Sequence, residues 1–374
     1  MKKICVYAIC MNEETFVESW VESMSEADVI VVLDTGSTDR TVELLKKHPK
    51  VQVYQQIIRP WRFDVARNAC LDLTPEDADI LVCTDLDERF ERGWRADLEA
   101  HWTDRTTRAS YRYTWNFLPD GREGVVFWID KIHSRKDHRW VHPVHEVLHW
   151  TGSGEEVYCY PPNIRLYHHA DPAKSRAQYL PLLELSVRED PLDDRNMHYL
   201  GREYLFRGEW EKCIETLQKH LLLPTARWAD ERAASMRYIA KSLTQLGDNA
   251  SARSWLLRAV AEAPHLREPY LDLALLLARQ KEWEGCLWLC KGALKIETRS
   301  QSYINEAESW GSLPFDLAAF ACYHLDRPEE AVAFASRALE QEPDNERLKR
   351  DLDCYRAALT AQQTKERPPD QGAL

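Results

Sequence analysis

Acidic residues directly follow predicted strands in the first part of the chain, where carboxylates can act on a bound ligand. Asp34 follows the apolar run 29–33, and Asp85-Leu86-Asp87 follows the run 80–83. Two carboxylates on one short turn can converge on a hard divalent cation, and such a cation neutralises a departing diphosphate. Open parallel sheets bind ligands beyond the carboxyl ends of their strands. An Asp-x-Asp turn alone is a weak signal, because acidic loops are common and usually solvated.

A second group of residues has the spacing of a zinc hydrolase. His145, Glu146 and His149 form a His-Glu-x-x-His pattern, which binds zinc when both histidines lie one turn apart on a helix. Pro143 stands just before the pattern and a Gly/Ser-rich stretch, residues 151–154, follows it, so at most two helical turns fit. The preceding sequence has the character of strands. A zinc hydrolase therefore remains only as the less favoured alternative.

The elements that position these residues alternate between strands and helices. We expect strands at 4–10, 29–33, 51–54 and 80–84, and helices at 14–24, 41–48 and 63–73. This alternation predicts a parallel sheet with helices on its faces, and the continuous apolar strands indicate burial on both sides. Residues 111–117 and 125–129, separated by a turn at Pro119-Asp120-Gly121, predict an antiparallel pair.

From about residue 174 the pattern becomes helical and repetitive. Four helical pairs, at 196–223, 233–264, 268–296 and 313–343, each carry a small residue at an inner position: Gly201, Ala240, Ala274 and Ala319. Ala274 follows Ala240 by 34 positions, which is the tetratricopeptide period, and the longer spacings elsewhere indicate insertions. The polar tail from residue 360 onwards is expected to be disordered.

Composition excludes several classes of protein. The chain has 374 residues with 44% apolar and 29% charged side chains, and a net charge of −12, which disfavours nucleic acid as a partner. No apolar run reaches the roughly 18 residues that a transmembrane helix requires. The ten cysteines lie mostly in apolar or helical runs without a Cys-x-x-Cys pair, which favours a reducing, cytoplasmic location.

Three motifs in order carry a family resemblance. Residues 12–14 (Asn-Glu-Glu), 34–39 (Asp-Thr-Gly-Ser-Thr-Asp) and 85–88 (Asp-Leu-Asp-Glu) each follow a predicted strand. Together they resemble the family 2 glycosyltransferases with a GT-A nucleotide-sugar-binding fold, and the chain is most similar to bacterial members with a C-terminal tetratricopeptide array. The similarity covers roughly residues 3–172 and continues towards the repeats.

The resemblance implies a role for individual residues in donor binding. Asp34 matches the aspartate that hydrogen-bonds the nucleotide base, typically uracil, and Arg67 matches an arginine near the nucleotide that could pair with phosphate. Asn12 and Glu13 belong to the same donor-binding set. Asp85 matches the ribose-diphosphate and metal motif. The alternatives from the residues alone are turn formation for Asp34 and a surface salt bridge for Arg67.

The resemblance also implies metal ligands and a base. Asp87 is the expected direct ligand of Mn²⁺ or Mg²⁺ beside Asp85, and a late histidine, His168 or His169, completes the set, with His168 favoured by the motif. Glu146 is the expected base that deprotonates the acceptor, and His145 orients it or binds substrate. Many relatives use an aspartate as the base, and a structural salt bridge is the alternative for Glu146.

These observations predict two domains and one main function. We expect a GT-A-like α/β domain with a mostly parallel sheet at 1–172, a linking helix at 173–193, tetratricopeptide-like repeats at 194–345, and a terminal helix and tail at 346–374. The expected reaction is metal-dependent, inverting transfer of a sugar from a nucleotide diphosphate, expected to be UDP, to a peptide, protein or glycan. Self-association through the repeats is a further expectation. The alternative is a non-catalytic tetratricopeptide adaptor with a degenerate first domain.

Overall fold

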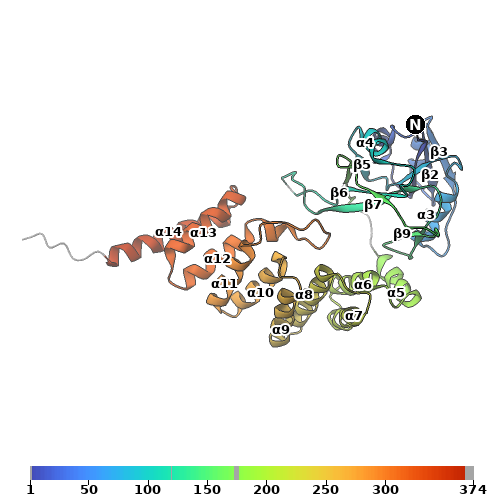
Figure 1. The fold of residues 1–374 in the computed structure, drawn as a ribbon. Helices are drawn as coiled ribbons and strands as arrows, with labels where there is room; N and C mark the ends of the chain where they lie inside the picture. Colours follow the sequence, from blue (N-terminus) through green and yellow to red (C-terminus); the bar gives the residue numbers. More distant parts are fainter. Residues whose placement is uncertain (1, 119, 172–176, 367–374) are drawn as a thin grey trace, which may run out of the picture. The chain divides into compact units, whose positions relative to one another are not determined.

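The computed structural model describes residues 2–118, 120–171 and 177–366, and it divides into two compact units (Figure 1). Unit 1 comprises residues 1–191 with 301–303, and unit 2 comprises residues 192–300 and 304–374. Pro119 of the predicted turn, residues 173–176 of the predicted linking helix and residues 367–374 of the predicted tail lie outside the described residues.

Unit 1 is built on a nine-stranded mixed sheet that begins with four parallel strands. These are β1 (Ile4–Cys10), β2 (Val29–Asp34), β3 (Val51–Gln55) and β4 (Ile80–Cys83), and the order across the sheet is β3-β2-β1-β4-β7-β6-β11-β5, with β10 beside β6. Every residue of β1, β2 and β4 is buried, which confirms the interpretation of the continuous apolar runs. The edge strand β3 is partly exposed.

Helices cover both faces of this sheet. Even-numbered residues of β1 pack in one core with α1 (Val17–Met24) and α4 (Trp94–His101), and odd-numbered residues pack in another with α3 (Phe63–Asp72). This two-sided burial follows from the period of two along a strand. The other helices of unit 1 are α2 (Thr41–Leu45) and α5 (Tyr179–Glu189).

The second half of the sheet contains the predicted antiparallel pair. β6 (Arg108–Thr114) pairs with β7 (Val126–Ser134), with Tyr113 opposite Phe127, so that prediction is confirmed. The remaining strands of the sheet are β5 (Glu88–Phe90), β10 (Tyr158–Cys159) and β11 (Arg165–His168). A separate hairpin consists of β8 (His138–Val141) and β9 (Val147–Trp150).

Unit 2 is an array of helical pairs, as the repeats predicted. The pairs are α6 (Asp194–Phe206) with α7 (Trp210–Leu222), α8 (Ala229–Gln245) with α9 (Asn249–Glu262), α10 (Arg267–Arg279) with α11 (Trp283–Leu294), and α12 (Leu313–His324) with α13 (Pro328–Gln341). The short helix η1 (Ala307–Trp310) lies in the insertion before the fourth pair. The four small inner residues are all buried, and a Cβ on Gly201 would lie 2.2 Å from Leu217 Cδ2. Small residues therefore permit the close approach of paired helices.

The terminal helix differs from the prediction. α14 (Glu346–Glu366) continues through residues 360–366, which were expected to be disordered. The first half of α14 packs on the array through the buried side chains of Leu348, Leu352 and Tyr355. From Glu346 onwards the sequence contains no proline until position 368, so no helix-breaking residue ends the helix earlier.

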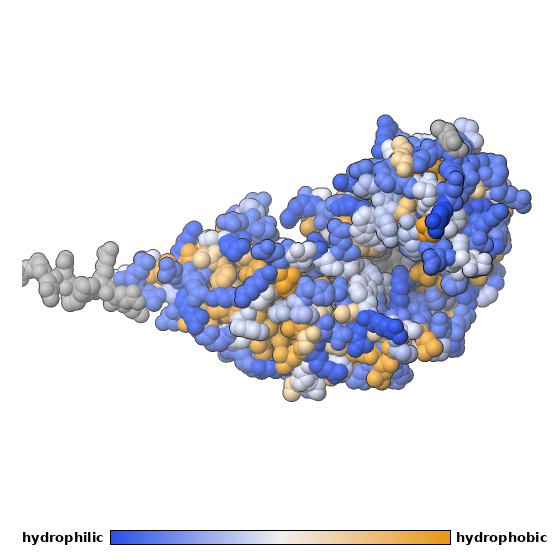
Figure 2. Space-filling view, viewed as in Figure 1, coloured by the Kyte–Doolittle hydropathy of each residue, from blue (hydrophilic) through white to orange (hydrophobic). Residues whose placement is uncertain are grey.

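Two further properties concern the surface and the thiols. All ten cysteines are free, and nine of them are buried. The surface is mainly hydrophilic, with apolar residues gathered over the helical array (Figure 2). In the described part of the chain, no helix combines the length and apolar character that crossing a bilayer requires.

Candidate functional site

The acidic turns lie at one edge of the parallel sheet. β1 separates β2 from β4, with Cys10 opposite Asp34 and Tyr7 opposite Cys83. Adjacent strands are about 4.8 Å apart, so the end of β2 and the turn after β4 are separated by roughly 10 Å. Asp34, the last residue of β2, and the 85–87 turn after β4 therefore lie at the same edge of the sheet, with β1 between the two strands.

Arg67 connects the acidic turn to the proposed base. Its guanidinium donates to Asp85 Oδ1 at 2.8 Å and, through Nε, to Glu146 Oε1. Arg67 is buried, and its guanidinium carbon lies 5.1 Å from the centre of the Trp140 ring. Burial alone lowers the pKa of Arg67, but the carboxylates of Asp85 and Glu146 raise it well above its ordinary value. The guanidinium thus stays charged and joins residues 18 and 79 positions away in sequence.

Lys131 is a member of the site that sequence reasoning missed. From the middle of β7, its ammonium lies 3.2 Å from Asp85 Oδ2 and 3.2 Å from Glu88 Oε1. Burial disfavours an ionised Asp85, but Arg67 and Lys131 lower the pKa of that carboxyl far below its ordinary range. No local pattern marks Lys131, because residues 126–134 do not alternate between apolar and polar and its place beside Asp85 depends on the pairing of β7 with β4.

Glu88 holds the backbone of the acidic turn in place. It is buried, accepts from the Asp85 backbone N–H at 2.9 Å and from the Tyr113 hydroxyl at 2.9 Å. Burial raises its pKa, an effect that the Lys131 ammonium opposes. These contacts fix the backbone of the 85–88 turn.

Asp87 and His168 form the second part of the site. His168 Nε2 lies 3.6 Å from Asp87 Oδ2, while Nδ1 lies 2.8 Å from the Trp115 carbonyl oxygen. Burial lowers the pKa of His168, but the hydrogen bond and charge of Asp87 raise it above its ordinary value. The side chain of His169 turns elsewhere and stacks on Phe117, with ring centres 5.6 Å apart.

The predicted donor-binding residues Asn12, Glu13 and Asp34 hold the neighbouring turns in this structure. Asp34 accepts from the backbone N–H groups of Gly36 and Ser37, at 3.1 to 3.3 Å. Asn12 has a left-handed backbone (φ 58°), and its side-chain oxygen accepts from Thr38 N at 2.8 Å. The backbone N–H of Glu13 donates to Thr41 Oγ1 at 2.7 Å. The nucleotide roles of these three residues remain predictions.

The loop before β9 carries Glu146 and His145. His142 and His145 both have left-handed backbone angles (φ 76° and 50°), which is uncommon for residues other than glycine. The His145 ring lies 5.8 Å from the Tyr179 ring. Such conformations concentrate at sites where the surrounding structure imposes them.

The zinc hydrolase alternative is wrong for this fold. His145 lies in the loop and His149 lies in strand β9, where it is exposed and opposite Arg139. The two imidazoles are therefore not one helical turn apart, as that site requires. In the described part of the chain, the group Asp194, His220 and Glu231 alone brings three ligand atoms of His, Cys, Asp or Glu within 4.8 Å of one another.

The donor set beside the acidic turn fits a divalent ion in part. Asp87 and His168 offer a carboxylate oxygen and an imidazole nitrogen, which suit Mn²⁺. Both oxygens of Asp85 instead meet cations, Arg67 and Lys131. Asp85 as a direct metal ligand therefore remains a prediction, whereas its contacts in this structure are those of a counter-ion.

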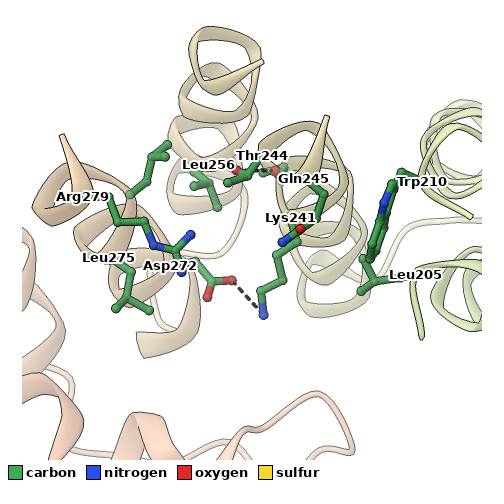
Figure 3. Close-up of a pocket in the computed structure, with 11 residues that line it drawn as sticks. Leu205, Trp210, Lys241, Thr244, Gln245, Leu256, Asp272, Leu275 and Arg279 are labelled. Atoms are coloured by element: carbon green, nitrogen blue, oxygen red, sulfur yellow. Dashed lines mark hydrogen bonds and ion pairs between the residues drawn. The ribbon is translucent and has the colours of Figure 1, made fainter. Parts of the chain in front are cut away.

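Unit 2 contains a separate groove of about 340 Å³ (Figure 3). It is lined by residues of α6, α7, α8, α9 and α10. Lys241 and Asp272, 3.4 Å apart, face each other across it, with Arg279 beside them, and Leu205 and Leu275 supply apolar walls. The groove combines apolar surface with both signs of charge.

Comparison with known proteins supports two different similarities. Residues 5–150 match the model of glycosyl transferase family 2, so the chain carries a domain of this kind. These residues include the acidic turn, Arg67 and Glu146, while His168 and His169 lie beyond them. A search of curated proteins found no match.

Solved structures match the helical half. MamA is 19% identical over 44% of this chain and 86% of its own, with a TM-score of 0.37. A thermophilic tetratricopeptide protein of Thermus thermophilus is 23% identical over 48% of this chain and 89% of its own, with a TM-score of 0.35. PilF of Pseudomonas aeruginosa is 11% identical over 47% of this chain and 72% of its own, with a TM-score of 0.37.

Proposed function

We propose that the chain is a metal-dependent, inverting glycosyltransferase that takes its sugar from a nucleotide diphosphate, with UDP as the expected nucleotide. The observation that supports this most is the Arg67 guanidinium, which joins Asp85 and Glu146 at the carboxyl edge of the sheet. The family 2 match over residues 5–150 gives the domain its class. The acceptor that we propose is a peptide or protein, with a glycan as the second candidate.

Asp87 and His168 are the residues that would hold Mn²⁺ or Mg²⁺. The ion supplies charge neutralisation for a departing diphosphate. Asp34 binds the base, and Asn12 and Glu13 hold the loop around it. Arg67 and Lys131 add positive charge beside the turn, where they attract phosphate oxygens.

Glu146 is the proposed base. It takes a proton from the acceptor while the acceptor atom attacks the anomeric carbon from the side opposite the diphosphate. Arg67 positions Glu146 by direct contact, and His145 flanks it in the same loop. Proximity of base and donor reduces the entropy that the reaction must lose.

The groove of unit 2 supports a protein acceptor. Helical repeat arrays form extended concave surfaces suited to peptides and partner proteins. The groove offers apolar walls for side chains and Lys241, Asp272 and Arg279 for polar groups of an extended segment. We place the protein in a reducing compartment, because its cysteines are free.

Donor screening tests the transferase proposal. The chain is incubated with Mn²⁺ and one UDP- or GDP-sugar at a time, and the release of free nucleotide is measured. The affinity for UDP is measured separately by calorimetry. We expect slow release of UDP from one donor, a loss of at least tenfold in UDP affinity in D87N, and no change in D72N, whose carboxylate pairs with Arg139 on the surface.

The same measurements distinguish the transferase from the non-catalytic adaptor. An adaptor with a degenerate first domain would bind no nucleotide sugar, and D87N would leave its properties unchanged. E146Q adds a second criterion, because loss of turnover with retained UDP binding is expected of a base. Equal loss of both in E146Q would indicate a structural role.

A further inference from the structure

Three helix ends meet at the beginning of the helical array, far in sequence from the acidic turn. Asp194 is the first residue of α6, His220 lies in the last turn of α7, and Glu231 lies in the first turn of α8. Their ligand atoms all lie within 4.8 Å of one another. His220 and Glu231 are buried and Asp194 is half-buried.

The spacing of these atoms is that of ligands around a common ion. His220 Nε2 lies 3.3 Å from Glu231 Oε1, which is longer than the usual 2.7–2.9 Å of a charge-assisted hydrogen bond. Two ligands bound at about 2.0–2.1 Å to a tetrahedral zinc ion are themselves about 3.3–3.4 Å apart. The pair is therefore already at the separation that a shared ion requires.

A buried hydrogen-bond relay orients the imidazole. His220 Nδ1 lies 3.0 Å from Ser235 Oγ, and the same hydroxyl lies 2.8 Å from His198 Nδ1. Ser235 and His198 are fully buried. Metal-binding histidines typically use their second nitrogen in this way, which leaves Nε2 directed at the ion. In the described part of the chain, His198 Nε2 is buried without a hydrogen-bond partner, so the relay ends on an unsatisfied polar atom.

The charges around the cluster also favour a cation. Two carboxylates share one imidazole, with Asp193 adjacent in sequence. The guanidinium carbons of Arg195 and Arg202 of α6 lie 5.0 and 4.5 Å from the centre of the Tyr199 ring. A divalent ion balances the two carboxylates and replaces their mutual repulsion with attraction.

From this geometry we infer that Asp194, His220 and Glu231 bind a divalent transition-metal ion of the zinc class, with water in the remaining position. One imidazole with carboxylates suits zinc rather than calcium or magnesium, which prefer oxygen ligands alone. The ion would join α6, α7 and α8 at the beginning of the array. This site is independent of the proposed transferase site.

Zinc binding to the full chain tests the inference. The D87N chain, which removes the acidic turn as a competing site, is freed of metal with a chelator and titrated with Zn²⁺ in a calorimeter. Co²⁺ in place of Zn²⁺ reports tetrahedral coordination by its visible absorption. We expect one ion per chain and a thermal midpoint that rises with added Zn²⁺.

Matched variants locate the ion. In the D87N background, H220Q is expected to weaken Zn²⁺ binding at least tenfold and to remove the cobalt absorption. H265Q is the control, because His265 also pairs with a carboxylate of α8, Asp230, at 2.8 Å, and among the residues that the structure describes no third His, Cys, Asp or Glu joins them. H265Q is expected to bind Zn²⁺ like its parent.

A second variant guards against loss of folding in H220Q. D194N changes a half-buried residue at a helix start, and circular dichroism verifies its fold; it is expected to weaken Zn²⁺ at least tenfold. The inference is overturned if the D87N chain binds no Zn²⁺. It is equally overturned if folded H220Q and D194N bind as the parent does, or if H265Q abolishes binding.

Discussion

Arg67 holds more of the proposed site together than any of the acidic residues around it. It meets Asp85 with one guanidinium nitrogen and Glu146 with another, and it rests against Trp140. Its planar fork can serve two carboxylates at once, which the single ammonium of lysine cannot do with the same geometry. The residue therefore links the donor side of the site to the proposed base.

Substituting Arg67 tests this link. R67A removes the cation that contacts Glu146 and leaves Asp85 with Lys131 alone, and breaking a buried pair in this way typically costs about 3–5 kcal/mol. We expect a loss of that size in denaturant unfolding and loss of UDP-sugar turnover. R139A, which breaks the exposed pair with Asp72, is the control and should cost less than about 1 kcal/mol. Equal losses in both variants would show that Arg67 is an ordinary surface cation.

R67K separates charge from geometry. It retains a cation near the turn but not the two-directional fork. We expect it to recover much of the stability that R67A loses, measured in the same denaturant unfolding experiment, and little of the turnover. Full recovery of turnover by R67K would contradict the positioning role of the guanidinium.

The pH dependence of metal binding follows from His168. Its pKa is raised in the fold, mainly by Asp87 against the effect of burial, so it holds its proton to higher pH than a free histidine. A protonated imidazole cannot bind a metal, so Mn²⁺ affinity should increase with pH until His168 is neutral and then level off. Calorimetry at several pH values in H168N should show this dependence removed. An unchanged pH profile in H168N would exclude His168 as a ligand.

The raised pKa of His168 also makes the stability of the fold depend on pH. Metal affinity is expected to increase with pH, whereas this contribution to stability decreases. Because the folded pKa of His168 is above the unfolded value of about 6.5, the pair with Asp87 stabilises the metal-free protein most at lower pH. This contribution is lost as pH rises through the folded pKa. Denaturant unfolding of D87N against the parent at pH 5.5 and 8.5 should therefore show the larger difference at pH 5.5, and the reverse order would contradict the pairing.

Part of the site was predictable from sequence for a simple reason. Asp85, Asp87 and Arg67 lie directly after a strand or inside a helix whose periodicity is clear, so their edge of the sheet could be predicted. Lys131 could not be assigned, because its place beside Asp85 depends on the antiparallel pairing of β7 with β4. That pairing joins residues about 50 positions apart and leaves no local pattern.

At the scale of elements, the boundaries of buried strands agreed best with the sequence. β1 begins and ends where the apolar run does, because every one of its residues is buried. α2 ends three residues earlier than expected, at Leu45, since only Thr41 and Leu45 are buried and nothing holds a further turn. The length of α14 was underestimated, because the polar composition from residue 360 onwards suggested disorder. Good helix formers without a proline continue the helix to Glu366.

The close approach of α6 and α7 provides a prediction for one helical pair. A Cβ on Gly201 would lie 2.2 Å from Leu217 Cδ2 and 2.4 Å from Cγ, so G201A should destabilise the array by about 1–3 kcal/mol despite its better helix propensity. G285A is the milder comparison, because its Cβ would meet a single atom at the end of a flexible side chain, Leu277 Cδ1 at 2.7 Å, and it is expected to cost less than G201A. Denaturant unfolding measures both variants.

A second measurement isolates the contact itself. In an L217A background the space beside Gly201 is open, so adding G201A should be neutral or stabilise by up to about 1 kcal/mol. The double-mutant cycle therefore has a large coupling energy. A cost for G201A that is unchanged in L217A would place the strain elsewhere.

At the scale of the whole molecule, each unit has hydrophobic cores of its own. Among the cores formed by described residues, the two that enclose the sheet contain only residues up to 166, and three in the array contain only residues from 221 onwards. Separate cores allow separate cooperative unfolding, because cooperativity follows shared burial. The chain is thus expected to unfold in two steps.

Scanning calorimetry and denaturant unfolding of R67A and G201A test whether the two units unfold separately. We expect two transitions, with R67A lowering the midpoint of one and G201A lowering the midpoint of the other. Added Mn²⁺ with UDP should raise only the transition that R67A affects, because a ligand stabilises the unit that binds it. In the D87N chain, where the acidic turn no longer competes for the ion, Zn²⁺ should raise only the transition that G201A affects. A single transition that moves with both variants would show that the two units unfold as one, despite their separate cores.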